Sequence, residues 1–200
     1  MPHQNRVLST SEIIRHPARG LFMGNRGILH DEHQQIGKPR WRHKAWIICN
    51  LTHKDWHREI MQPGNYTELF FLDEAVALAA GHRPCALCRR SAYNDFLTAA
   101  DHIDPVRHFD DHLHNARAIP RKFTQRRHTT SITDLPDYTI IFENAPKLIL
   151  GNHLREVRPD GYGPPKPRPR SGSVTVLTPE PTIKALRNGY RPMLHPSARG

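Results

Sequence analysis

The chain has 200 residues, and 29 Lys and Arg against 19 Asp and Glu give it a formal net charge of +10 and a pI of about 10.0. That balance favours a polyanionic partner, with nucleic acid first and an acidic membrane surface second. The length suits one compact domain or two small ones. Hydrophobic residues make up 37%, below the roughly 45–50% of an average domain, and the 18 prolines predict irregular segments. Collagen and coiled-coil folds are excluded.

Three further features of the sequence bear on where the protein is located. No apolar run approaches the roughly 20 residues that span a bilayer. The first twenty residues lack the apolar core and cleavage site of a secretory signal. The three cysteines cannot form a closed disulfide framework. We therefore expect a cytoplasmic protein that does not contact membranes.

The pattern over residues 1–116 predicts loops, short strands and three helices. Residues 1–44 have little periodicity, whereas short apolar runs at 45–51 and 66–72 are typical of strands. A helix is expected from Asp73 to Gly81, because acidic residues occupy its first turn and glycine commonly ends a helix. Helical spacing of apolar residues predicts two more helices, at 89–100 and 105–118.

The pattern over residues 117–200 predicts a small β-rich part. A basic connector occupies 117–130 and leads to the other expected elements, namely a hairpin (138–143 and 147–151), an extended proline-rich segment (158–172), a strand (174–177) and a short helix (182–189). We therefore predict an α+β fold: a small zinc-centred mixed α/β module over 1–116, and a basic connector with a β-rich part over 117–200.

The prediction of zinc comes from Cys85 and Cys88, which have the spacing C-x-x-C. Two thiolates in such a tight turn can both reach one zinc ion at about 2.3 Å. A thioredoxin-like redox pair and a chance occurrence are the alternatives. A redox pair normally begins a helix, whereas here a predicted helix ends just before the pair, at Gly81. Zinc is therefore favoured.

The residues around this pair resemble a known zinc module. The segment FFLDEAVALAAGHRPCALCRR (70–90) is similar to the second half of the metal-binding domain at the N-terminus of Ada-type DNA alkylation-repair proteins. That family has paired Phe residues, a short Ala-rich helix and then G-[FY]-R-P-C-x-x-C. The resemblance covers about a tenth of the chain. It implies a four-ligand zinc module that contacts DNA, and a role in DNA repair, modification or defence.

The resemblance also implies two further ligands, which this chain supplies differently. The family has C-x3-C, or H-x3-C in shorter relatives, after Gly-Asn. Here the segment MGNRGILH (23–30) resembles that lead-in and places His30 at the first ligand, but Gln34 cannot be the next. We therefore predict the set His30, Cys49, Cys85 and Cys88, with His53 or His33 as alternatives to His30. His82 replaces an aromatic residue of the pattern and is expected to be structural.

The replacement at the first ligand changes the expected chemistry. In Ada proteins a zinc-bound thiolate of the first pair accepts a methyl group from a phosphotriester. An imidazole at His30 cannot accept the methyl group in this way. A structural zinc ion is therefore expected, rather than methyl transfer.

Basic residues close to aromatic ones predict a nucleic-acid surface. Cations bind phosphates and flat rings stack on bases. The segment around Trp41 has this composition, and two further basic clusters lie beside the cysteine pair and in the connector. The predicted binding residues are Lys38, Arg40, Trp41, Arg42, Lys44, Arg83, Arg89, Arg90, Arg121, Lys122, Arg126 and Arg127.

Two other functions are open at this point. The first is a metal-dependent hydrolase or nuclease built on the His108–His114 segment, because His108 and His112 are spaced i, i+4 on a predicted helix with Asp111 beside them. The second is a protein-interaction module, in which the proline-rich segment 163–171 binds the aromatic groove of a partner.

Overall fold

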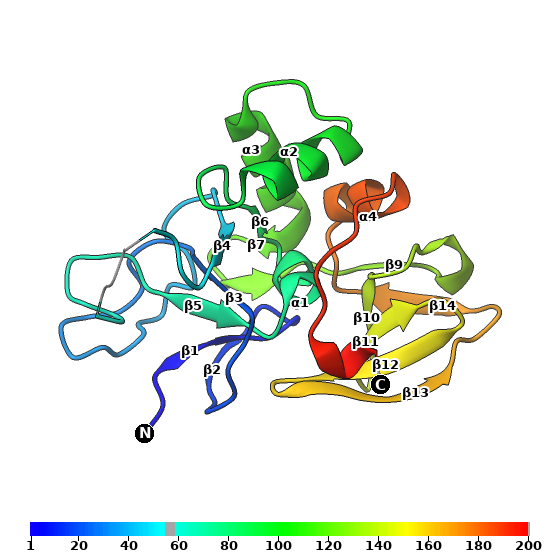
Figure 1. Ribbon diagram of the computed structural model, residues 1–200, viewed down its shortest axis with the longest axis horizontal. Coiled ribbons are helices and arrows are strands. Elements are labelled where there is room, and N and C mark those ends of the chain that lie inside the picture. Colours follow the sequence, from blue (N-terminus) through cyan, green and yellow to red (C-terminus); the bar gives the residue numbers. More distant parts are fainter. Residues whose placement is uncertain (55–58, 200) are drawn as a thin grey trace.

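A computed structural model describes residues 1–54 and 59–199. The first half of the chain forms a mixed six-stranded sheet in the order β2-β1-β5-β3-β4-β6 (Figure 1). Its strands are β1 (Gln4–Val7), β2 (Ile13–Arg15), β3 (Phe22–Asn25), β4 (Ile47–Asn50), β5 (Leu69–Phe71) and β6 (Arg83–Pro84). The pairs β1–β5 and β4–β6 are parallel. Helices α2 (Arg90–Ala99) and α3 (Val106–Arg117) follow the sheet and contribute Phe96, Phe109 and Leu113 to its core.

The second half forms an antiparallel six-stranded sheet in the order β13-β12-β11-β10-β14-β9. The short pair β7 (Ala118–Ile119) and β8 (Thr124–Gln125) precedes it. Its strands are β9 (His128–Ser131), β10 (Ile140–Glu143), β11 (Ala145–Leu150), β12 (His153–Arg158), β13 (Gly161–Pro167) and β14 (Ser173–Val176). Helix α4 (Glu180–Arg187) follows, and two 3-10 turns occur at Ile132–Asp134 and Pro196–Ala198.

Helix α1 (Glu74–Ala79) lies between the two sheets (Figure 1). Its residues Val76 and Ala79 pack against Ile140 and Leu177 of the second half. Helix α4, from the second half of the chain, contacts α2 and α3 of the first half. Residues on both sides of the expected boundary at 116 and 117 therefore pack into shared cores.

Two adjacent acidic residues connect the start of α1 to the C-terminal segment. Asp73 caps the helix by accepting from the Val76 N–H, and it also accepts from the Tyr162 hydroxyl at 2.6 Å and the His195 N–H at 3.0 Å. Glu74 accepts from the Tyr190 hydroxyl at 2.5 Å. Both carboxylates are buried, so these donors are needed to offset their desolvation. The C-terminal segment is thereby held between the two sheets.

The structure confirms the α+β fold class, and the predicted helices and strands lie close to their expected positions. Asp73 caps α1, and Gly81 ends it with φ +88. At Gly81 a Cβ atom would lie 2.3 Å from the Cδ atom of Arg117, so only glycine fits. Strands β6, β7, β8, β9, β12 and β13 were not predicted. Within the described residues, no helix is long and apolar enough to cross a membrane.

The proline-rich segment is extended as expected, but it is part of a sheet. Residues up to Pro167 belong to β13, which pairs with β12 through Arg155↔Pro165 and His153↔Pro167. Strand β13 is at the edge of the second sheet. Proline lacks an N–H group and is tolerated at an edge, where it also discourages further strand addition. Residues 161–167 of the segment therefore form the edge strand of the second sheet, in which the prolines are tolerated.

Candidate metal centre and basic groove

Three cysteines from two segments meet at one end of the first sheet. Cys49 is on β4, and Cys85 and Cys88 are in the turn between β6 and α2. The parallel pairing of β4 with β6 brings the segments together, and the Cys85 N–H donates to the Ile48 carbonyl at 2.9 Å. The three sulfur atoms lie within 4.8 Å of one another. Cys85 is buried, whereas Cys49 and Cys88 are partly exposed.

Hydrogen bonds within the cluster favour negative charge on one sulfur. The pKa of Cys85 is well below that of a free thiol, because the thiols of Cys49 and Cys88 and the N–H groups of Cys88 and Leu87 donate to its sulfur. The Leu87 N–H lies 3.4 Å from Cys85 Sγ. The pKa of Cys49 is raised, because its thiol donates to the other two sulfurs and is partly buried. Only a bound cation would allow all three to ionise together.

The cluster fits a metal ion that prefers sulfur. Three thiols with converging sulfur atoms and a backbone N–H donor on one of them are the ligand set that soft or borderline cations bind. In residues 1–54 and 59–199, no fourth Cys, His, Asp or Glu ligand atom lies within 4.8 Å of all three sulfurs. Cys49, Cys85 and Cys88 can therefore hold a metal from three sides.

The structure does not bring His30 to this cluster. Its Nδ1 atom lies 2.6 Å from the Thr67 hydroxyl, and its Nε2 atom lies 3.3 Å from the Gln62 carbonyl oxygen. The predicted fourth ligand is thus a buried histidine that ties its own loop to the segment before β5. The alternatives His53 and His33 also lie outside the group of converging ligand atoms.

Two arginines and an indole form a buried stack behind the first sheet. The guanidinium groups of Arg26 and Arg117 lie 4.2 and 3.9 Å from the ring centroid of Trp46, and all three side chains are almost fully buried. Arg26 donates to His82, which also contacts Phe71 ring to ring at 4.6 Å. His82 is therefore structural, as predicted. Burial and the nearby charge of Arg40 lower the pKa of Arg26 to about 9.

Two arginines predicted to bind nucleic acid are buried in ion pairs instead. Arg83 makes a bidentate pair with Asp110, at 2.7 and 2.8 Å, with side chains only 6% and 7% exposed. Arg89 pairs with Glu74 at 2.8 Å and lies over the Phe22 ring. Neither guanidinium is free to contact a polyanion. Their role is to hold α2 and α3 against the first sheet.

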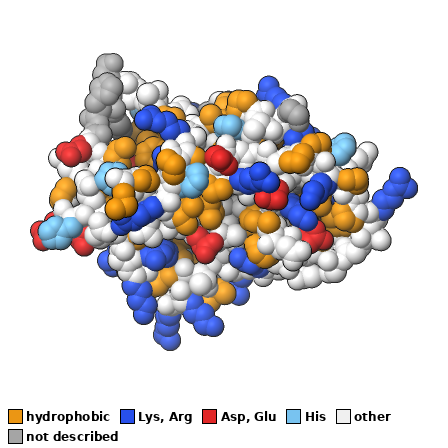
Figure 2. Space-filling view, turned by 90° about the horizontal axis from the view of Figure 1, so that it is seen from below, with side chains coloured by type: hydrophobic (Ala, Val, Ile, Leu, Met, Phe, Trp, Pro, Cys, Tyr) orange, Lys and Arg blue, Asp and Glu red, His pale blue; other side chains and the backbone are white. Residues whose placement is uncertain are grey.

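An open groove of about 830 Å³ gathers four other basic side chains. Lys38 and Arg40 come from the loop before β4, and Lys122 and Arg127 come from the connector around β8. Glu12 is the one acidic residue in its lining. Figure 2 shows lysine and arginine side chains at several places on the lower face of the molecule, with fewer acidic side chains among them. Folding thus joins two of the three predicted basic clusters.

The other predicted contact residues do not line this groove, and several of them have other partners. Trp41 is half-buried and packs against Trp46, His114 and Phe123, at centroid distances of 4.9 to 5.5 Å, so it is not a free stacking surface. The rest are exposed: Arg42, which donates to the Ile28 carbonyl, Lys44, which pairs with Asp111, Arg126, which donates to the Asn115 carbonyl, and Arg90 and Arg121.

The groove is also lined by two aromatic residues that sequence reasoning did not single out. Phe123 follows Lys122 directly, and Phe142 comes from β10 of the second sheet. The guanidinium of Arg127 lies 4.7 Å from the Phe142 centroid. The adjacency of Phe123 to Arg121 and Lys122 was a visible signal. Phe142 had none, because it is far from any basic cluster in the sequence.

The residues of the predicted hydrolase segment lie on the solvent side of α3. His108, Asp111 and His112 are exposed, and Asp111 pairs with Lys44 at 2.7 Å. His114, in the same segment, is instead buried against Trp41 and Trp46. Burial and the charge of Arg117 lower its pKa to about 4. The three exposed groups line neither the groove nor the cysteine cluster.

No protein-family model, curated protein or solved structure matches this chain.

Proposed function

We propose that the protein holds a zinc ion at Cys49, Cys85 and Cys88 and binds nucleic acid, with DNA as the expected polymer, along the basic groove. Zinc is supported by the three converging sulfurs, because this ion takes sulfur ligands in tetrahedral sites. Bound there, zinc would stabilise all three thiolates. It would also tie β4 to the turn before α2, which is a structural contribution.

Nucleic acid is supported chiefly by the composition of the groove. Four basic side chains from two distant segments face one open channel that contains a single acidic group, Glu12. Lys38, Lys122 and Arg127 are exposed and form no ion pair with an acidic residue of the described chain. Long, solvated cations of this kind suit a repeating chain of phosphates and release counterions when they bind it.

The buried charge behind the groove supports the same proposal. Arg26 donates to the Ser11 carbonyl at 3.2 Å, and Ser11 lines the groove. The cation of Arg26 is almost fully buried and has no ion pair with a described acidic residue. A buried charge is screened little by salt, so it adds to the positive potential that the groove presents to an anion.

Metal analysis of the purified protein tests the zinc ion. After saturation with zinc and removal of excess, wild type should retain about one ion per chain. Cys85→Ser and Cys49→Ser should each lose most of it. Leu87→Ser changes an exposed residue of the same turn and should keep it. A folded wild-type protein that retains no metal would refute the zinc site, as would equal loss from the Leu87→Ser control.

Salt-dependent binding tests the groove. The affinity for a fluorescent 20-nucleotide single-stranded DNA would be measured by anisotropy at several salt concentrations, with the same RNA strand in parallel. Replacing Lys38, Arg40, Lys122 and Arg127 by alanine should weaken binding at low salt. It should also reduce the slope of log affinity against log salt by about 3, which is the value for four lost phosphate contacts on a single strand.

A charge-matched variant controls for the loss of overall charge. Lys166, Lys184, Arg107 and Arg170 are exposed and lie outside the groove. Replacing these four by alanine removes the same number of lysines and arginines. This variant should bind with nearly the wild-type slope. Equal weakening of the two variants would mean that only net charge matters, and the groove assignment would fall.

A further inference from the structure

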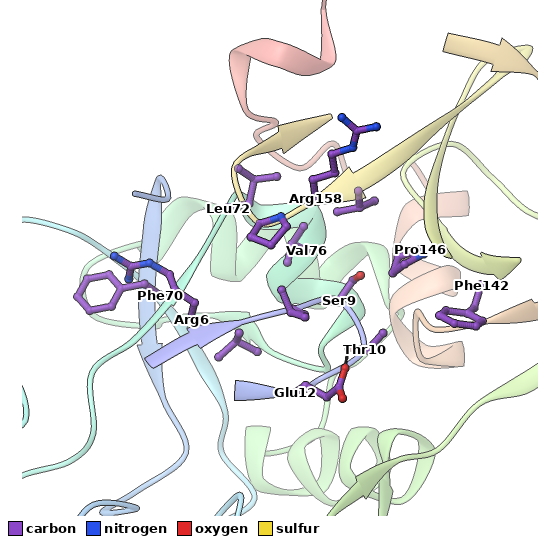
Figure 3. A pocket seen from close by; sticks show the side chains of 14 residues that line it. Arg6, Ser9, Thr10, Glu12, Phe70, Leu72, Val76, Phe142, Pro146 and Arg158 are labelled. Atoms are coloured by element: carbon purple, nitrogen blue, oxygen red, sulfur yellow. Dashed lines mark hydrogen bonds between the residues drawn. The ribbon is translucent and has the colours of Figure 1, made fainter. Parts of the chain in front are cut away.

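A second, smaller cavity lies between the two sheets. Its volume is about 210 Å³, and it is lined mainly by apolar residues (Figure 3). Leu72 and Val76 come from the α1 region, and Phe142, Pro146 and Val157 come from the second sheet. Figure 3 shows Ser9, Thr10 and Glu12 along one side of the cavity. Each sheet contributes one wall, so the cavity forms only when the two sheets of the chain pack together.

This cavity borders the basic groove. Thr10, Glu12 and Phe142 line both spaces. The Thr10 hydroxyl donates to the Glu12 carboxylate at 2.7 Å, which fixes the hairpin turn at the junction. A ligand that follows the four basic side chains of the groove therefore meets the ring of Phe142 and then apolar walls.

The charges change along this path. The groove has four cations, whereas Glu12 at the junction would repel a phosphate. Beyond the junction the lining includes two arginines that already have partners, with Arg6 over the Phe70 ring at 4.7 Å and Arg158 paired with Glu156 at 2.9 Å. Most of the lining is apolar, so it suits a flat or apolar part of a ligand, and a donor facing Glu12 would be favoured. Nucleobases meet these requirements, since several carry an amino group that a carboxylate accepts from.

We propose that the cavity receives one unpaired base of a single-stranded nucleic acid whose phosphates lie along the basic groove. The proposal rests on the proposed function and specifies its substrate as a strand with accessible bases. A volume of about 210 Å³ is below the roughly 300–1,000 Å³ of pockets for drug-sized molecules, so it suits a single ring system. Proteins that take up a base in this way stack it between aromatic and apolar side chains, which is the role of Phe142 and Val157.

Filling the cavity tests the proposal. Val157→Phe adds a ring to the cavity wall, and Val174→Phe makes the same change on β14, outside the cavity and the groove. Binding would be measured with a 12-nucleotide single-stranded DNA, the same sequence as a duplex, and a strand with abasic residues in place of bases. Val157→Phe should weaken binding of the normal single strand about tenfold, which is the effect of losing one stacked base. Its affinity for the duplex and the abasic strand should match that of Val174→Phe.

A measurement on the wild-type protein covers the case in which Val157→Phe does not fold. A single strand with 2-aminopurine at one position reports whether a base is enclosed. Binding should shield its fluorescence from quenching by acrylamide, and high salt should remove the shielding. Bound strands whose bases remain fully open to acrylamide would overturn the base cavity. So would equal affinity of the single strand and the duplex, while a groove variant that still lost binding would leave the proposed function intact.

Discussion

Arginines of the interior and cations of the groove have different roles in this protein. Arg26, Arg83 and Arg117 are 5% exposed or less, and they contact aromatic rings, backbone carbonyl oxygens or a buried carboxylate. Lys38 and Lys122 are exposed in an open channel. The interior set builds the fold, and only the exposed set is free to bind a ligand. Net charge alone therefore overstates the binding surface.

The largest effect is expected from breaking the ion pair of the interior. Arg83→Ala leaves Asp110 buried without its bidentate partner, and this should destabilise the protein by about 3–5 kcal/mol. The double variant Arg83→Met with Asp110→Leu removes both charges and should recover most of the loss. Urea unfolding measures both. A single variant as stable as wild type would mean that the pair does not support the fold.

A smaller effect is expected from Arg117→Met. The guanidinium donates to the carbonyl oxygens of Gly81 and Lys44, and losing these bonds should cost about 1–3 kcal/mol. Arg121→Met makes the same change on the surface and should stay within about 0.5 kcal/mol of wild type. Thermal unfolding of the two variants compares the interior and the surface directly. Equal destabilisation would abolish the distinction.

The smallest effect concerns pH. The folded-state pKa of His114 is about 4, below its ordinary value of 6.5, because of burial and the charges of Arg117 and Lys44, which outweigh Asp111. The neutral form is therefore favoured in the folded protein. The stability linked to this neutral histidine is fully present above pH 6.5 and is lost as pH falls toward 4, because the unfolded chain then binds a proton that the folded protein does not. His82 acts in the same direction.

His114→Phe keeps an aromatic ring that cannot gain a proton. Urea midpoints at pH 7.5 and pH 5 should therefore differ less in His114→Phe than in wild type. His108→Phe, at an exposed position of the same helix, should leave the wild-type difference unchanged. If His114→Phe loses as much stability between the two pH values as wild type, protonation of this residue is not the cause.

Local signals in the sequence predicted much of the fold. The acidic residues at the start of α1, the glycines that end α1 and α4, and the short apolar runs all correspond to observed elements. Strands β12 and β13 were missed because charged residues and prolines dominate them. Their pairing comes from the neighbouring strands of the sheet, which a local pattern does not contain.

The candidate site was less accessible to sequence reasoning. The spacing of Cys85 and Cys88 predicted their proximity, and Cys49 joins them because β4 pairs with β6. His30 followed from the resemblance alone, and the fold gives it other partners. Burial explains why some predicted binding residues were wrong. An arginine such as Arg83 is normally exposed, and the sequence does not show that the packing of α3 brings Asp110 to it as a buried partner.

Lysine footprinting tests the central distinction most directly. The protein would be acetylated with a water-soluble reagent, with and without saturating single-stranded DNA, and each lysine followed by mass spectrometry. We predict that the strand protects Lys38 and Lys122 in the groove and leaves Lys166 and Lys184 as reactive as before. Equal protection of all four lysines, or protection only of the second pair, would contradict the assignment of the groove as the binding surface.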